Sequence, residues 1–81
     1  MDLMDTIAMM KSVDYKERFK AEYYQLETRT FKLADMLTKY EMGLLDFEPS
    51  CPVELLTMQL NAMRIYAYVL KERAKIEGIE L

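Results

Sequence analysis

The sequence contains no histidine and no tryptophan, and it has one cysteine, two glycines and two prolines among 81 residues. Without histidine, general acid-base catalysis and metal binding lose the side chain that most often serves them. The single thiol, Cys51, cannot form an intramolecular disulfide, which is typical of a protein from a reducing cytosol. The scarcity of glycine and proline excludes a loop-rich or low-complexity chain.

Long apolar runs and a strong charge imbalance are missing as well. No apolar stretch approaches the ~20 residues of a membrane span, and Asp2 and Asp5 do not suit a signal peptide. Membrane-surface helices need a lysine-rich polar face, whereas Glu and Lys alternate here. The formal net charge of −3 argues against a surface that coats DNA or RNA, although it leaves room for a local basic pocket. We therefore expect a cytosolic protein with no membrane partner and no nucleic-acid polymer as partner.

The residues that carry chemistry do not form a catalytic arrangement. No nucleophile-plus-base constellation and no glycine-rich phosphate loop is present. Cys51 beside Pro52 is most simply a residue at a helix entry, and a reactive thiol is the alternative interpretation. We expect a protein that is not an enzyme and that uses no cofactor and no metal.

The first thirteen residues form a segment of their own. Leu3, Ile7 and Met10 recur at i, i+4 and i+7, which predicts a short amphipathic helix within 2–11. A helix this short is marginal alone, so it must dock on another element or fray. A disordered extension is the alternative. Residues 1–13 are therefore interpreted as a short N-terminal helix or extension, and residues 14–81 as a helical hairpin domain.

A first long helix is predicted to begin at Tyr15 and to end at Gly43. Asp14 followed by Glu17 is a capping-box pattern, and glycine is the usual left-handed residue after a helix. Between these signals, apolar and aromatic residues step by three and four along one face and predict a core stripe. The stripe comprises Tyr15, Phe19, Tyr23, Leu26, Thr30, Leu33, Leu37 and Tyr40.

A second long helix is predicted from Pro52 to Glu77, with Gly78 as its C-terminal cap and Ser50 or Cys51 as its N-terminal cap. Two apolar stripes run along it, whereas an ordinary surface helix has one. We therefore expect this helix to face two partners, or a partner and a ligand. The first stripe is Leu56, Leu60, Met63, Ala67, Leu70 and Ala74, and the second is Leu55, Met58, Ala62, Ile65, Val69 and Ile76.

Two helices of matched length with a short connection predict an antiparallel hairpin. The expected fold class is all-α: an antiparallel hairpin of two long helices with a short N-terminal helix. A chain of this size is only marginally stable alone, and Tyr24 and Phe31 lie on the side of the first helix that a lone hairpin would leave wet. We therefore expect the hairpin to assemble as a homo-oligomer.

A polar seam separates the two apolar stripes of the second helix. Gln59, Tyr66 and Arg73 are seven residues apart and stack on one edge. Glu22 and Arg29 form a similar flank on the first helix. Arg and Lys offer charge and donors to phosphate, and Tyr offers a planar face to a base. The candidate ligand-binding residues are Tyr15, Arg18, Lys20, Glu22, Arg29, Gln59, Arg64, Tyr66 and Arg73.

The seam has a second interpretation that involves no ligand. Gln59, Tyr66 and Arg73 can instead pair with Glu22 and Arg29 across the hairpin and hold its register. Physical reasoning from the residues alone favours this internal pairing.

The spacing of these residues resembles that of a known group of phage proteins. It is similar to the hairpin domain of the Acb/Tad-type anti-CBASS and anti-Thoeris sponge proteins, and the loop LDFEPSCP is similar to that of short phage proteins of unassigned role. The resemblance covers about Asp14 to Ile79. Its pattern is Arg18-Phe19-x-x-Glu22-x-x-x-Leu26-x-x-Arg29-x-x-x-Leu33, followed by Gln59-x-x-x-Met63-x-x-Tyr66-x-x-x-Leu70-x-x-Arg73.

The resemblance implies a phage protein that acts in the cytoplasm of its bacterial host. Such a protein would form a homo-oligomer, a hexamer in preference to a dimer. It would bind a cyclic dinucleotide, a cyclic trinucleotide or a cyclic ADP-ribose-like signal between protomers without breaking a bond. The longer anti-Thoeris members carry a β-rich domain before the hairpin, which this sequence lacks. The alternative function is a helical-hairpin module for protein-protein interaction that has no small-molecule ligand.

Overall fold

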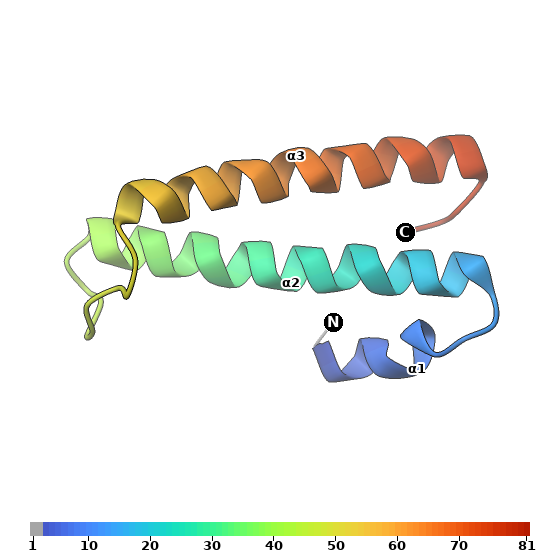
Figure 1. Ribbon diagram of the computed structural model, residues 1–81, viewed down its shortest axis with the longest axis horizontal. Helices are drawn as coiled ribbons and strands as arrows, with labels where there is room; N and C mark the ends of the chain where they lie inside the picture. The colour runs from blue at the N-terminus through green and yellow to red at the C-terminus, as the bar shows by residue number, and fades with distance from the viewer. Residues whose placement is uncertain (1–2) are drawn as a thin grey trace.

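The structure, a computed structural model, describes residues 3–81 and measures 43 × 24 × 17 Å along its principal axes. Its elements are a 3-10 helix, η1 (Leu3–Thr6), followed by α1 (Ile7–Met10), α2 (Tyr15–Glu41) and α3 (Val53–Glu77). Figure 1 shows α2 and α3 side by side and antiparallel, with the N-terminal segment along the other side of α2. Over this part of the chain all regular structure is helical, so the predicted all-α hairpin is confirmed.

Helix α2 begins at the predicted cap. The Asp14 carboxylate accepts a hydrogen bond of 3.0 Å from the backbone N–H of Lys16. The backbone N–H of Asp14 donates to Ser12 Oγ at 3.1 Å, which is the donor that a capping box would assign to Glu17. Ser12 takes over this function because the turn before the helix brings its hydroxyl within reach.

A glycine in the left-handed region follows each long helix, as predicted: Gly43 comes directly after Met42, the C-cap of α2, and Gly78 is itself the C-cap of α3. Gly43 and Gly78 each have φ of 72°, a conformation that other residues adopt at a cost. The Leu44 N–H donates to the Lys39 carbonyl at 2.8 Å, a capping bond of the Schellman type. After Gly78, the Ile79 N–H donates back into the last turn of α3 in the same way. The chain direction is therefore reset sharply at both helix ends.

Helix α3 begins one residue later than predicted. Pro52 occupies the N-cap position, and no side chain caps this end, so the prediction of Ser50 or Cys51 as cap is wrong. The carbonyl of Pro52 accepts from the backbone N–H of Leu56 at 3.2 Å and thereby starts the helical ladder. Proline is suited to this position because its ring fixes φ and because an N–H there would find no helical acceptor.

The core lies between α2 and α3, where the predicted stripe of α2 meets the first stripe of α3. Tyr15 and Tyr40, at the two ends of the α2 stripe, are 47% and 43% exposed and fall outside the core. Burial of each large apolar side chain stabilises the hairpin by about 1.5–3 kcal/mol. The buried cluster comprises Phe19, Tyr23, Leu26, Leu70, Ala74 and Ile79, with Tyr24, Met63 and Ala67 packed against it.

The N-terminal segment docks on α2, which agrees with the prediction of a short docked helix and not with the alternative of a disordered extension. Thr6 is fully buried, and its hydroxyl donates to the Leu3 carbonyl at 2.6 Å. The side-chain amide of Gln25 donates to the same hydroxyl at 3.0 Å. Ala21, four residues before Gln25 and therefore on the same face of α2, is also fully buried. This small residue lets the N-terminal segment approach α2 closely.

The docked side of the N-terminal segment agrees with the predicted one only in part. Leu3 is half-buried, and the side-chain amide of Gln25 on α2 donates a hydrogen bond to the sulfur of Met10, although Met10 is 50% exposed. Ile7 is 45% exposed, and the fully buried residue of the segment is Thr6, whose hydroxyl is satisfied by two hydrogen bonds. The prediction missed Thr6 because it counted only apolar residues as candidates for burial.

The second apolar stripe of α3 lies on the side of the helix that faces away from α2. Met58 is 67%, Ile65 66% and Ile76 86% exposed. Within residues 3–81, α2 is the one element that packs against α3, so the described chain supplies one of the predicted partners of this helix. None of the helices in residues 3–81 has the length and hydropathy to cross a bilayer.

Candidate functional site

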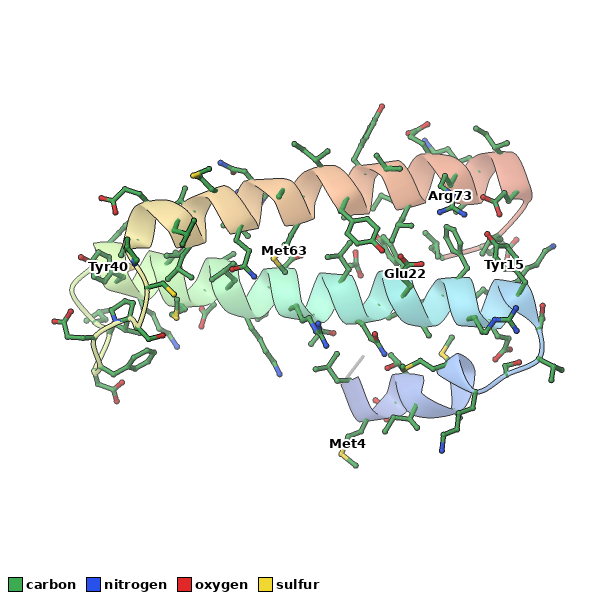
Figure 2. The ribbon with its side chains drawn as sticks, viewed as in Figure 1. Met4, Tyr15, Glu22, Tyr40, Met63 and Arg73 are labelled. Atoms are coloured by element: carbon green, nitrogen blue, oxygen red, sulfur yellow. The ribbon has the colours of Figure 1, made fainter. Side chains whose placement is uncertain are left out.

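Two candidate site residues, Tyr15 and Arg73, meet a third side chain, Glu77, where α2 begins and α3 ends. The hydroxyl of Tyr15 donates to Glu77 Oε1 at 2.8 Å and accepts from the guanidinium of Arg73 at 2.9 Å. Arg73 also donates through Nε to Glu77 Oε2 at 3.1 Å. Figure 2 shows Tyr15 and Arg73 together at this end, in the space between the helices. We call this cluster the Tyr15-Arg73-Glu77 triad.

Hydrogen bonds within the triad shift the pKa of all three groups. The hydrogen bond to Glu77 is the main cause that raises the pKa of Tyr15. The same bond is the main cause that lowers the pKa of Glu77. The pKa of Arg73 is raised chiefly by its hydrogen bond to Glu77. Two of the predicted site residues, Tyr15 and Arg73, are therefore already paired within the chain.

The pairing of Arg73 differs from the one that the seam hypothesis predicted. Glu22 contributes only through its charge, as the last of the causes that raise the pKa of Arg73, whereas Glu77 and Tyr15 hold the guanidinium directly. Internal closure of the seam is thus correct for Arg73, but its partner is Glu77. Glu77 escaped the sequence reasoning because it was considered only as the last residue of the helix.

The other predicted residues on this side of the hairpin have separate environments. Arg18 donates to the carbonyl of Ser12 at 2.9 Å and so holds the turn before α2. Arg29, Gln59 and Tyr66 are exposed, and none of them has a hydrogen bond or ion pair to another side chain in the described part of the chain. The seam therefore consists of a closed triad at one end and open polar residues along the remainder.

Lys20 and Arg64 lie on the other side of the hairpin from the seam. Arg64 lines a hollow together with Phe31 and Lys71. Lys20 precedes Phe31 by eleven residues, which is close to three helical turns, so it shares that side of α2. Tyr66 and Tyr68 are two residues apart and thus point in nearly opposite directions from α3. Within the single chain, the nine candidate residues consequently lie on two sides of the hairpin.

Two adjoining hollows of about 550 and 570 Å³ run along this other side, between α2 and α3. Both are lined by Glu27, Tyr68 and Lys71, so they form one continuous depression. We call it the aromatic groove. The residues that define it here are Tyr24, Glu27, Phe31, Arg64, Tyr68 and Lys71.

The aromatic groove presents flat rings next to unpaired cations. Phe31 is 72% and Tyr68 63% exposed, so each can offer a ring face to a ligand. Arg64 and Lys71 take part in none of the ion pairs formed within residues 3–81. Guanidinium and ammonium groups bind phosphate, and aromatic rings stack on nucleobases. The groove thus holds both kinds of group that a nucleotide needs.

An acidic side chain lies among these rings and cations. Glu27 accepts a hydrogen bond of 2.5 Å from the hydroxyl of the buried Tyr23. Burial is the main cause that raises the pKa of Tyr23 to about 12, and the hydrogen bond to Glu27 is the next. The second carboxylate oxygen of Glu27 can accept from an amino group, such as that of a base.

The sequence holds a signal for the aromatic groove that the seam hypothesis did not use. Tyr24 and Phe31 are seven residues apart on α2, and Arg64 and Lys71 are seven apart on α3. On antiparallel helices, two such pairs can face the same groove. Neither Lys71 nor Tyr68 was among the candidate ligand-binding residues.

Over residues 3–81 no group of three or more His, Cys, Asp or Glu side chains could hold a metal ion. The thiol of Cys51 is free and exposed, in the connection before α3.

Comparison with known proteins identifies a family. Neither the curated proteins nor the solved structures yielded a match. The model of the family described as Sequestin matches residues 13–76, a range that begins just before α2 and ends within the last turn of α3. It therefore spans both long helices and most of the chain, and it includes the aromatic groove and the second apolar stripe. The chain belongs to the Sequestin family.

Proposed function

We propose that the protein is a phage-encoded, non-enzymatic sponge that sequesters cyclic oligonucleotide immune signals and so inhibits CBASS- or Thoeris-type anti-phage defence. It acts as a homo-oligomer in the cytoplasm of the bacterial host. The observation that carries the proposal is the aromatic groove, where the exposed rings of Phe31 and Tyr68 lie beside the unpaired cations Arg64 and Lys71. A sequestering role also agrees with the name of the family.

The groove suits a ligand that repeats bases and phosphates in a small ring. Stacking of a base on an aromatic ring contributes about 1–3 kcal/mol, and Phe31 and Tyr68 supply two such surfaces. Arg64 and Lys71 supply one cation each for the phosphates. A cyclic dinucleotide or trinucleotide carries several groups of each kind, whereas a single-base nucleotide uses only part of the groove.

Sequestration requires binding alone, and that is what these side chains offer. Neither the groove nor the triad contains a serine, cysteine or histidine, the side chains of the usual nucleophile-plus-base constellations. A bound signal is withheld from its effector in proportion to the amount of protein present, because each site removes one molecule. The ligand leaves the protein unchanged.

Calorimetric titration with cyclic dinucleotides and cyclic trinucleotides, each added separately, tests this function. We expect heat of binding and a higher melting temperature with at least one of them, since a ligand that binds only the folded state stabilises it. Chromatography of the ligand after release should return it intact. Absence of heat and of a thermal shift with every cyclic nucleotide would overturn the proposal.

Matched charge reversals separate the groove from the seam. Lys71→Glu and Arg64→Glu each reverse one unpaired cation of the groove, and Arg29→Glu reverses one exposed cation of the seam. We expect the two groove variants to lose the heat of binding while Arg29→Glu retains it. The opposite result would transfer the ligand site to the seam and leave the sponge function in place.

A second candidate function is a hairpin module for protein-protein interaction with no small-molecule ligand. The exposed second stripe of α3 favours it, because apolar surface of this extent commonly marks an interface. A chain that associates with itself but gives no heat with any cyclic nucleotide would support this function over sequestration.

A further inference from the structure

We infer that the second stripe of α3 is a self-complementary interface, on which the same helix of a second copy packs in antiparallel orientation. The inference rests on the proposed function only for the expectation that the chain self-associates. Ligand binding is not part of it. It specifies which surface is used, in which direction the helices run and which side chains meet.

The spacing of the stripe is that of a coiled coil. Glu72 lies on the same face of α3 as the six apolar residues of the stripe and is counted with them here. The seven positions follow one another in alternating steps of three and four residues: Leu55, Met58, Ala62, Ile65, Val69, Glu72 and Ile76. This repeat keeps one apolar seam facing a partner helix along the whole contact. The core-facing stripe of α3 is already occupied by α2, whereas the six apolar members of this one are exposed. The unpartnered face therefore has the pattern of a helix that packs on a second helix.

The one charged member of the stripe decides the direction of the partner. In a parallel pair of identical helices, Glu72 would lie opposite Glu72 of the second copy, and two carboxylates would repel each other. In an antiparallel pair centred on Ala62 opposite Ile65, Glu72 lies opposite Leu55 near the end of the contact, where water can reach it. The antiparallel pair avoids the repulsion.

Charge complementarity at the edge of the stripe favours the same direction. Glu54 and Lys75 flank the stripe on one edge, near opposite ends of α3. The antiparallel register places Glu54 opposite Lys75 of the second copy, and the two-fold symmetry repeats this pair. A parallel register would place Glu54 opposite Gln59 instead. Lys75 is 73% exposed and already lies 3.2 Å from Glu72, so it can approach the second carboxylate without leaving the first.

The interface extends to the edge of the aromatic groove. Tyr68 lines the groove and also flanks the stripe on the same edge as Glu54 and Lys75. In the antiparallel register it lies opposite Asn61 of the second copy, whose side-chain amide can donate and accept hydrogen bonds. The second copy therefore borders a groove that is open to solvent in the single chain.

The mass of the full chain in solution, measured by sedimentation without ligand and with reducing agent, tests the interface. We expect an assembly of at least two copies for the unaltered chain and a shift to monomer for Ile65→Glu, with circular dichroism unchanged. Val13→Glu is the matched control, because Val13 is 97% exposed and lies outside the stripe. An unaltered chain that is monomeric, or an Ile65→Glu variant with unchanged mass, would overturn the inference.

A charge exchange tests the direction of the helices. Glu54→Lys and Lys75→Glu should each weaken self-association by about fivefold, and the double variant should recover most of the loss. A double variant as weak as either single variant would overturn the antiparallel register.

Ligand titration of the same samples keeps the two proposals apart. A monomer that still gives heat with a cyclic nucleotide overturns the interface and leaves the sponge function standing. A dimer that gives no heat with any cyclic nucleotide overturns the sponge function and leaves the interface standing.

Discussion

The guanidinium of Arg73 lies 5.1 Å from the centre of the Phe19 ring and covers the buried core at the end of the hairpin where α2 begins. A cation over an aromatic face is attracted to it, and the same guanidinium holds Glu77 and Tyr15. The end of the hairpin that has no connecting loop is therefore closed by side chains. This closure leads to the first prediction.

Removal of the Tyr15 hydroxyl should loosen that end and reduce the dependence of stability on pH. The lowered pKa of Glu77 gives a stabilisation that is present above about 4.5 and is lost as the pH falls through the folded-state value. The raised pKa of Tyr15 gives one that is present below 10 and is lost as the pH rises further. The melting temperature of Tyr15→Phe should vary less in both ranges. Tyr40→Phe, at the other end of α2, should keep the profile of the unaltered chain.

Tyr23 should be the last tyrosine to ionise. Its pKa is raised to about 12 by burial and by its hydrogen bond to Glu27, so its stabilising effect is lost as the pH rises from 10 through 12. Absorbance titration of the phenolates should show one group that ionises together with unfolding, and Tyr23→Phe should remove that component. Persistence of the late component in Tyr23→Phe would contradict the assignment.

Leu70→Ala should be among the costly substitutions in the chain. Leu70 is completely buried in the cluster between α2 and α3, and replacement of a buried leucine by alanine costs about 2–5 kcal/mol. Urea denaturation should report this loss. Val13→Ala, at a position that is 97% exposed, should change the free energy of unfolding by less than about 0.5 kcal/mol.

Gly43→Ala should destabilise the chain through its backbone alone. The residue has φ of 72°, and a Cβ built there meets no atom within 4 Å, so no steric clash contributes. The left-handed conformation costs an L-residue about 1 kcal/mol, and Gly43→Asn should cost less because asparagine tolerates it better. Chemical denaturation of the two variants should show this order, and equal losses would contradict the backbone explanation.

The sequence predicts most of the fold because its signals are local. Asp14, Gly43 and Gly78 mark helix ends through bonds to their own neighbours, and the stripes repeat at the period of the helix. Thr6 shows where this reasoning stops. Its burial depends on a hydrogen bond from Gln25, nineteen residues away, and a hydrophobic pattern contains no information about that bond.

The candidate site is predicted less well because it depends on how each helix is turned about its axis. Arg64 and Tyr66 are two residues apart and therefore point to nearly opposite sides of α3. The packing of Leu60 and Leu70 in the core decides that the side of Arg64 lines the aromatic groove. Tyr15 and Arg73 were grouped correctly, since the antiparallel hairpin brings residue 15 next to residue 73. Glu77 lies four residues after Arg73 on the same helix, so this ion pair could have been read from the sequence, whereas the bond between Glu77 and Tyr15 requires both ends of the hairpin.

The exposed Cys51 gives the protein a built-in reporter of helix direction. As the sole thiol of the chain, it can carry a pyrene maleimide without any change of sequence. Two such labels would sit at opposite ends of an antiparallel α3 pair, about 38 Å apart at 1.5 Å per residue, and would emit as separate monomers. In a parallel pair they would stack and show excimer fluorescence. The ratio of excimer to monomer fluorescence therefore distinguishes the antiparallel from the parallel pair without any amino-acid substitution.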